Sequence, residues 1–120
     1  YAAGVVRWTT DVAGNFTAAG NVFAYSDAKL KHDIVRIPDA LARLKTLRGV
    51  NFRWNRDDST GIGFIAQEVE AVFPELIQEC ADVKTVAYGN MTAVLVEAVN
   101  ELSAQITELK LEVARLRGGL

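Results

Sequence analysis

Cysteine and histidine are nearly absent from this chain of 120 residues, which has only Cys80 and His32. A lone cysteine cannot form an internal disulfide, and with one histidine it cannot build a zinc site, so we expect no metal and no cofactor. We interpret Cys80 as a small apolar residue, buried or half-buried. The sequence also lacks an apolar run of about 18 residues and a signal-peptide pattern, so no membrane partner is expected.

A basic excess is missing as well. Lys and Arg number 13 against 15 Asp and Glu, which gives a net charge of -2. Nucleic-acid binding is therefore not expected, because no positive field draws a phosphate backbone. The length is enough for one domain with a modest core. The first residue is Tyr1 rather than a methionine, which suggests a piece of a longer protein.

Residues 1–25 carry little charge, with Arg7 and Asp11 as the only charged residues. The composition predicts a strand over residues 5–10, a turn over 13–15 and a second strand over 21–25. A piece of this length cannot support its own core, so we expect it to be the end of a larger β-rich domain or fibre.

Residues 26–90 show mixed patterns that predict a small α+β domain. A helical period from residue 31 to Gly49 favours one amphipathic helix or two short ones; its apolar positions are Ile34, Ile37, Leu41, Leu44 and Leu47. Alternation over residues 50–54 and 62–65 predicts a hairpin, and residues 66–73 predict a short helix that ends at Pro74. Residues 76–79 and 84–88 are candidates for a second strand pair.

From Met91 to Arg117 there is no Gly or Pro over 27 residues, which predicts a helix of roughly 40 Å. Its apolar residues alternate spacings of four and three, the pattern of a coiled-coil seam: Leu95, Val99, Leu102, Ile106, Leu109, Val113 and Leu116. β-branched residues at a and Leu at d favour two strands. The alternative is that this helix packs only on its own domain.

An ordered series of motifs connects these segments. It comprises Ser26-Asp27-Ala28-Lys29-Leu30-Lys31 with Ile34, Ala40-Leu41, Val50-Asn51-Phe52-Arg53-Trp54, Gly63-Phe64-Ile65-Ala66-Gln67-Glu68-Val69-Glu70, Phe73-Pro74-Glu75-Leu76, Val86-Ala87-Tyr88 and Leu95-Val96-Glu97-Ala98-Val99. Over residues 26 to 117 the series resembles the C-terminal intramolecular chaperone domain of bacteriophage tail spikes, tail fibres and neck appendages, a family of self-cleaving peptidases. A related domain occurs in myelin regulatory factors, whose cleavage releases a DNA-binding segment, but residues 1–25 look more like a phage fibre.

The resemblance implies a homotrimer, in place of the two strands that the heptad rule favours. It implies that residues 1–25 end a β-rich fibre or spike, that residues 26–90 are the chaperone and auto-processing domain, and that residues 91–117 are its coiled coil. The upstream fibre would be both the folding client and the cleavage substrate. Assembly would take place in the host cytoplasm, with the mature fibre in the virion tail and the chaperone domain released.

The resemblance also implies cleavage of the Tyr25–Ser26 bond, with Ser26 as nucleophile and Lys31 as general base. A lysine removes a proton only when it is neutral, so desolvation during assembly would favour activity; Lys29 would help, while Asp27 and Asp33 would oppose. Five residues of helix turn through roughly 140°, so Ser26 must lie outside the helix or the segment must bend. Asp27 is read as a helix N-terminal residue, or as a group that orients the site.

Two other signals favour structural roles. Gly61 to Ala66 matches the dinucleotide pattern G-x-G-x-x-A, but without a surrounding βαβ unit these glycines are expected to close the hairpin and allow tight packing beneath Phe64. Glu68 and Glu70 have no convergent metal-binding partners. The strongest rival function is a non-catalytic trimerisation module, in which Ser26 and Lys31 are idle.

Overall fold

The computed structural model describes residues 4–119, which form two compact units. One unit ends at Ile34 and the other begins at Val35, so the segment with Ser26 and Lys31 belongs to the first unit. The predicted functional boundaries, at Tyr25–Ser26 and at Asn90–Met91, do not coincide with this division and remain predictions. Tyr1 lies outside the described residues.

The first unit contains one antiparallel hairpin, with β1 at Trp8–Thr10 and β2 at Phe16–Ala18. The predicted strand at residues 21–25 is wrong, since these residues have no regular structure. The predicted turn is correct and explains the difference. The Asp11 carboxylate accepts hydrogen bonds from the backbone N–H groups of Ala13 and Asn15, both at 2.9 Å, and folds the chain back at once, so that β2 pairs with β1.

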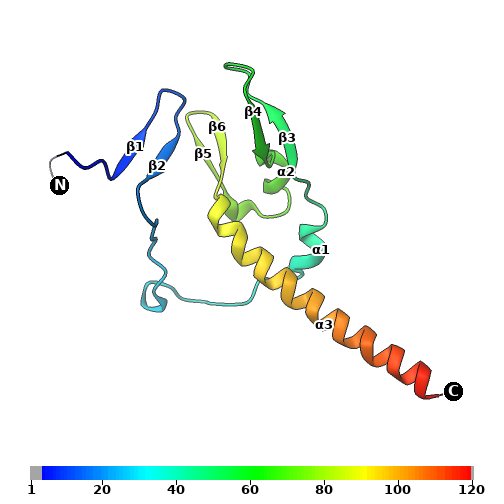
Figure 1. Ribbon diagram of the computed structural model, residues 1–120. Coiled ribbons are helices and arrows are strands. Elements are labelled where there is room, and N and C mark those ends of the chain that lie inside the picture. Colours follow the sequence, from blue (N-terminus) through cyan, green and yellow to red (C-terminus); the bar gives the residue numbers. More distant parts are fainter. Residues whose placement is uncertain (1–3, 120) are drawn as a thin grey trace. The chain divides into compact units, whose positions relative to one another are not determined.

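The second unit combines two hairpins with short helices and one long helix (Figure 1). In chain order its elements are α1 Ala40–Leu44, β3 Val50–Arg53, β4 Thr60–Gly63, α2 Ala66–Glu70, η2 Pro74–Leu76, β5 Ile77–Cys80, β6 Val83–Val86, η3 Tyr88–Asn90 and α3 Met91–Gly118. Strand β3 pairs with β4 and β5 with β6, both antiparallel. The predicted α+β fold class, both predicted hairpins and the long C-terminal helix are confirmed.

The helical period over residues 31–49 was misleading, because only the five residues of α1 are α-helical in this stretch. Asp33 and Asp39 have left-handed backbones, with φ of 53° and 51°, and Pro38 disfavours a helical residue before it. Four of the five periodic apolar residues still pack against the core: Ile37, Leu41, Leu44 and Leu47. The helical period therefore identified residues that pack against the core, but it overestimated the length of the helix.

The core of the second unit lies where α1, α2 and the start of α3 meet. Its buried side chains are Ala40, Val69, Phe73, Leu76, Met91, Val94 and Ala98. Cys80 is not among them: it is exposed, which corrects the expectation of a buried or half-buried residue. The reason is its place at the end of β5, beside the tight turn of Ala81 and Asp82, where a two-stranded hairpin extends beyond the core.

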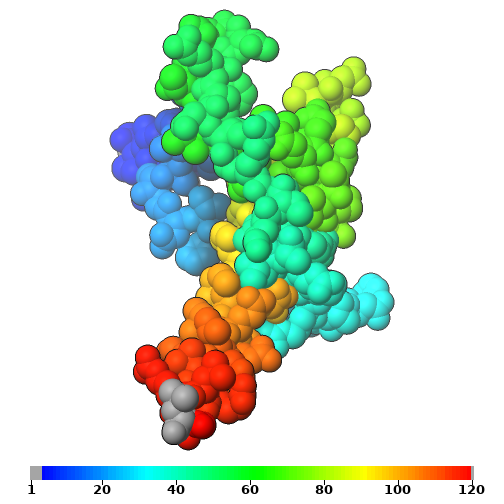
Figure 2. Space-filling model, turned by 90° about the vertical axis from the view of Figure 1, so that its right-hand side faces the viewer, coloured from blue at the N-terminus to red at the C-terminus, as the bar shows by residue number. Residues whose placement is uncertain are grey.

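Helix α3 uses different faces along its length. Met91, Val94 and Ala98 face the core of their own unit, and α1 packs against α3 there. The C-terminal half of α3, orange to red in Figure 2, extends away from the teal and green atoms of its unit. All seven predicted seam residues stay exposed, from Leu95 to Leu116. Packing on its own domain thus involves another face and leaves the seam uncovered among the described residues.

Candidate functional site

The segment that carries Ser26 and Lys31 is a single turn rather than a long helix. Ala28–Leu30 form the 3-10 helix η1, and Asp27 is its N-cap, whose Oδ1 accepts the backbone N–H of Lys29 at 3.0 Å. The Lys31 N–H donates to the carbonyl of Ala28 at 3.1 Å and closes the turn. Asp27 thus has the N-terminal position expected of it, while a role in orienting the site remains a prediction.

The turn brings the two predicted catalytic side chains together. Lys31 Nζ donates a hydrogen bond to Ser26 Oγ at 2.8 Å. Ser26 precedes the cap, and Lys31 follows η1 with an extended backbone, φ -131° and ψ 155°, so the segment bends as a continuous helix would not. The two side chains are within direct proton-transfer distance.

Charged neighbours of this pair are engaged with each other. Lys29 Nζ lies 3.6 Å from Asp27 Oδ2, and His32 Nε2 lies 3.8 Å from Asp33 Oδ2. The two aspartates expected to hold Lys31 in its charged form therefore each lie beside a side chain other than Lys31. All these groups, and the side chain of Tyr25 at 96% exposure, face solvent in the single chain. The single chain therefore does not bury the Ser26–Lys31 pair, and burial is the condition that would favour a neutral lysine.

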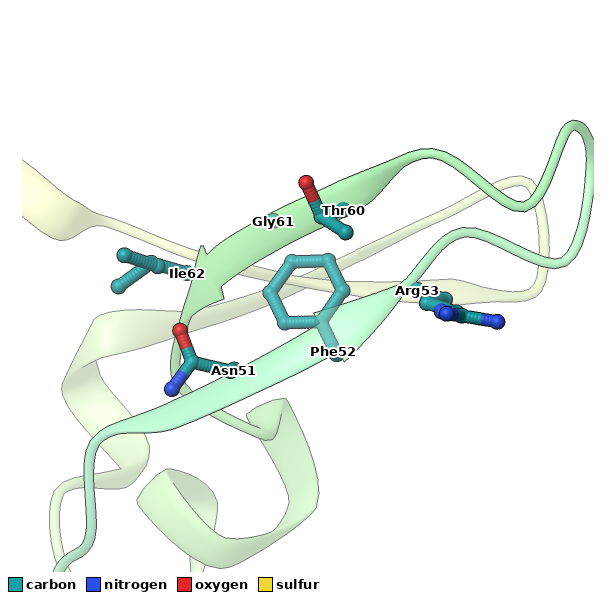
Figure 3. A pocket seen from close by; sticks show the side chains of 6 residues that line it. All are labelled: Asn51, Phe52, Arg53, Thr60, Gly61 and Ile62. Atoms are coloured by element: carbon teal, nitrogen blue, oxygen red, sulfur yellow. The ribbon is translucent and has the colours of Figure 1, made fainter.

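The glycine pattern at residues 61–66 belongs to a hairpin and not to a phosphate cradle. Figure 3 shows the Phe52 ring over Gly61, where a Cβ atom would come within 2.6 Å of the ring. A Cβ atom on Gly63 would collide with the Tyr88 hydroxyl, which accepts the Phe64 N–H at 3.0 Å. The expected tight packing exists, but the rings that require it are those of Phe52 and Tyr88 rather than Phe64.

The acidic residues Glu68 and Glu70 form ion pairs. Both carboxylate oxygens of Glu68 accept from Arg48 at 2.9 Å, and this hydrogen bonding lowers the pKa of Glu68. Glu70 accepts from Lys84 at 2.9 Å. Within residues 4–119 no cluster of three or more His, Cys, Asp or Glu side chains could hold a metal ion, and no helix of this part is long and apolar enough to cross a membrane.

Two further polar contacts, absent from the sequence predictions, connect α3 to the chain just before α1 and to the start of α1. Arg36 forms a two-pronged pair with Glu97, and Glu101 accepts backbone N–H groups at the start of α1. Since the partners are 60 or 61 residues apart, no local pattern indicates them. The only sequence signal is the spacing of Glu97 and Glu101 by four, which puts both on one face of a helix.

Comparison with known proteins gives one family match. Residues 26–78 match the family described as chaperone of endosialidase, whose name also classes it as a peptidase family. The long tail fiber protein Gp37 of Enterobacteria phage K3 is 35% identical over 102 residues, covering 77% of this chain, and that of Salmonella phage S16 is 34% identical over 104 residues, also covering 77%. Myelin regulatory factor homolog 1 of Caenorhabditis elegans is 28% identical over 123 residues, covering 87%.

The match begins at Ser26, the first residue of the motif series and of the Ser26–Lys31 turn. It ends within β5, so it covers η1, α1, the β3–β4 hairpin, α2 and η2. The relatives are much longer than this chain, which spans 8% of the phage K3 protein, 14% of the phage S16 protein and 13% of the nematode protein.

Proposed function

Residues 26–78 make this chain a member of the chaperone of endosialidase family, and from that premise we propose that it is the self-releasing C-terminal chaperone of a phage tail fibre. In this proposal three copies assemble through α3 and direct the folding of the β-rich fibre to which residues 1–25 belong. The chaperone then leaves by cutting the Tyr25–Ser26 bond. The fibre stays in the virion tail after assembly in the host cytoplasm.

One observation carries the catalytic part of the proposal: the hydrogen bond of 2.8 Å between Lys31 Nζ and Ser26 Oγ. In the charged form the ammonium donates, and in the neutral form the amine accepts the serine proton over the same distance. Burial disfavours a charged lysine, so packing of neighbouring chains over this exposed turn favours the form that acts as a base. Assembly therefore permits cleavage.

The reaction uses only groups that the chain supplies, plus water. Lys31 takes the proton of the Ser26 hydroxyl, whose oxygen attacks the Tyr25 carbonyl carbon through a five-membered ring. The C–N bond between Tyr25 and Ser26 breaks, the amine of Ser26 takes up the proton, and Tyr25 is held as an ester on Oγ. Water hydrolyses the ester, which leaves a carboxylate on Tyr25 and restores the hydroxyl.

The developing oxyanion needs donors near the start of η1. Because the N–H of Lys29 is taken by the Asp27 carboxylate, the candidate donors there are the N–H groups of Asp27 and Ala28. In this assignment the Asp27 side chain would also support catalysis, because its bond to the Lys29 N–H fixes the turn that carries the two donor N–H groups.

The decisive experiment is mass spectrometry of the freshly folded chain, together with N-terminal sequencing. We expect a product that begins at Ser26, and we expect only intact chain from Ser26→Ala. Normal cleavage by Ser26→Ala would refute the proposed nucleophile.

The second candidate function, a non-catalytic trimerisation module, is favoured by the exposed seam of α3 alone. It predicts intact chain in every sample, with an unchanged trimer.

A further inference from the structure

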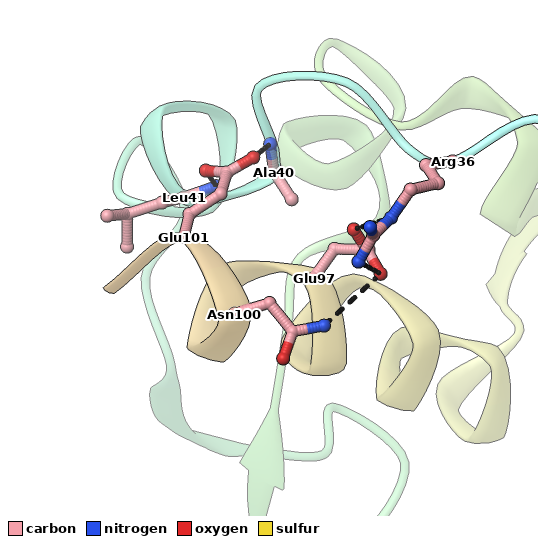
Figure 4. Close-up of polar contacts among 6 residues, drawn as sticks. All are labelled: Arg36, Ala40, Leu41, Glu97, Asn100 and Glu101. Atoms are coloured by element: carbon pink, nitrogen blue, oxygen red, sulfur yellow. Dashed lines mark hydrogen bonds and ion pairs between the residues drawn. The ribbon is translucent and has the colours of Figure 1, made fainter. Parts of the chain in front are cut away.

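A two-pronged ion pair holds the chain just after the Ser26–Lys31 turn to the long helix. Arg36 Nε and Nη2 donate to Glu97 Oε2 and Oε1 at 3.1 and 3.2 Å, and Asn100 Nδ2 lies 3.5 Å from Glu97 Oε1 (Figure 4). The Glu97 side chain is only 19% exposed, whereas that of Arg36 is 77% exposed. Two parallel charge-assisted hydrogen bonds fix an angle as well as a distance. The pair therefore fixes the position of the Arg36 side chain relative to α3.

One turn later along α3, Glu101 makes a second attachment. Its carboxylate accepts the backbone N–H groups of Ala40 at 3.0 Å and Leu41 at 2.8 Å. The N-cap residue of α1, Asp39, makes no capping bond with its own side chain. Glu101 thus satisfies N–H groups that a helix start leaves open. Successive turns of α3 hold the chain at residue 36 and at residues 40–41.

Both attachments use a face of α3 other than the seam. In the register that has Val99 at a and Leu102 at d, Glu101 is at c of the same heptad and Glu97 is at f of the heptad before, both on the side opposite to a and d. The seam residues Val99 and Leu102 remain exposed on the same turns. Helix α3 can therefore bind neighbouring helices through its seam while it keeps hold of residues 36–41.

Lys31 precedes Arg36 by five residues, and the described chain between them contains no helix or strand. A short irregular connection moves freely unless its ends are held. The Arg36–Glu97 pair is the first attachment to α3 that follows Lys31 among the side-chain hydrogen bonds of the described residues. The pair therefore holds the C-terminal end of the connection that begins at Lys31.

We propose that Arg36 and Glu97 are positioning residues for self-cleavage, which fix the catalytic turn against the assembled coiled coil. The inference rests on the proposed function. It explains how assembly along α3 reaches a turn that is far from the seam in sequence: neighbours bind one face of the helix, and the other face holds the chain that carries Lys31. Without the pair, assembly proceeds, but the turn is not held where neighbouring chains bury it.

The test compares Arg36→Ala with Arg48→Ala. Arg48 is a matched control, because it also forms a two-pronged pair with a glutamate, Glu68, at 2.9 Å and has a similar exposure of 69%. We expect Arg36→Ala to remain a trimer by sedimentation and to cleave roughly ten- to hundredfold more slowly, because small displacements of reacting groups have effects of that size. Arg48→Ala should cleave at the normal rate.

A charge reversal separates positioning from a general loss of stability. Arg36→Glu and Glu97→Arg should each slow cleavage, and the double variant should recover most of the rate because the pair re-forms with its partners exchanged. Normal cleavage by a trimeric Arg36→Ala, or equal slowing by Arg48→Ala, would overturn the inference. Loss of the trimer in Arg36→Ala would overturn it as well, because the pair would then act on assembly.

Failure of the inference is distinguishable from failure of the proposed function. If Ser26→Ala blocks cleavage while a trimeric Arg36→Ala cleaves normally, the dyad stands and the positioning role falls. If Ser26→Ala cleaves normally, the proposed function itself falls.

Discussion

At the scale of single residues, Lys31 differs from its neighbour Lys29 by its partner, a serine hydroxyl rather than a carboxylate. We predict that Lys31→Arg strongly slows cleavage, because a guanidinium can still donate to Ser26 but does not lose its proton at accessible pH. The loss should be about 10²–10⁴-fold, the usual contribution of a general base.

Lys29→Arg is the matched control for this prediction, since it keeps the charge beside Asp27 and should leave the rate within about twofold, as expected of an exposed ion pair. Time courses by mass spectrometry give both rates. A Lys31→Arg chain that cuts as fast as the unaltered chain would show that proton removal depends on another group.

Gly63 is a residue whose identity the structure explains by space alone. We predict that Gly63→Ala destabilises the chain by about 1–3 kcal/mol, because the new methyl group collides with the Tyr88 hydroxyl that accepts the Phe64 N–H. Gly49→Ala is the control, since nothing lies within 4 Å of a Cβ atom there. Urea denaturation of both variants in a Ser26→Ala background measures the difference, and equal stability of the two would contradict this account.

At the scale of elements, α1 depends on a side chain from another helix. We predict that Glu101→Ala lowers stability by about 1–2 kcal/mol, the usual effect of removing a cap, because the N–H groups of Ala40 and Leu41 lose their acceptor. Glu108→Ala is the control: Glu108 has the same heptad position one repeat later and forms no side-chain hydrogen bond among the described residues. Urea denaturation followed by circular dichroism is the measurement, and an equal effect of both changes would exclude the cap.

The same scale shows where the sequence was informative. The heptads of α3 and the alternation of β3 predicted these elements correctly, because in each of them the apolar residues repeat with the period of one face. Residues 31–49 also had a helical period, but the left-handed Asp33 and Asp39 interrupt it, and α1 receives its cap from Glu101.

For the candidate site, the motif indicated Ser26 and Lys31, and the distance between their side chains came only from the structure. Contacts between residues 61 positions apart, such as Arg36 with Glu97, have no local signature at all. Sequence reasoning therefore reached the residues proposed to react and missed those proposed to position them.

At the scale of the whole molecule, the proposal joins two features of the single chain. The turn with Ser26 and Lys31 is exposed to solvent, and so is the seam of α3. We predict that Leu109→Asp prevents assembly and stops cleavage together, because a charge at a d position cannot be buried between helices at low cost. Sedimentation and the yield of the product that begins at Ser26 are measured on the same sample.

Leu111→Asp is the matched control, since Leu111 is also exposed on α3 but lies at f, outside the seam. It should assemble and cleave as the unaltered chain does, which separates the position of the new charge from its presence on the helix. Leu102→Asp should behave like Leu109→Asp. Rapid cleavage by a chain that sediments as a monomer would refute the link between assembly and activity, because the turn would then need no neighbour to make Lys31 a base.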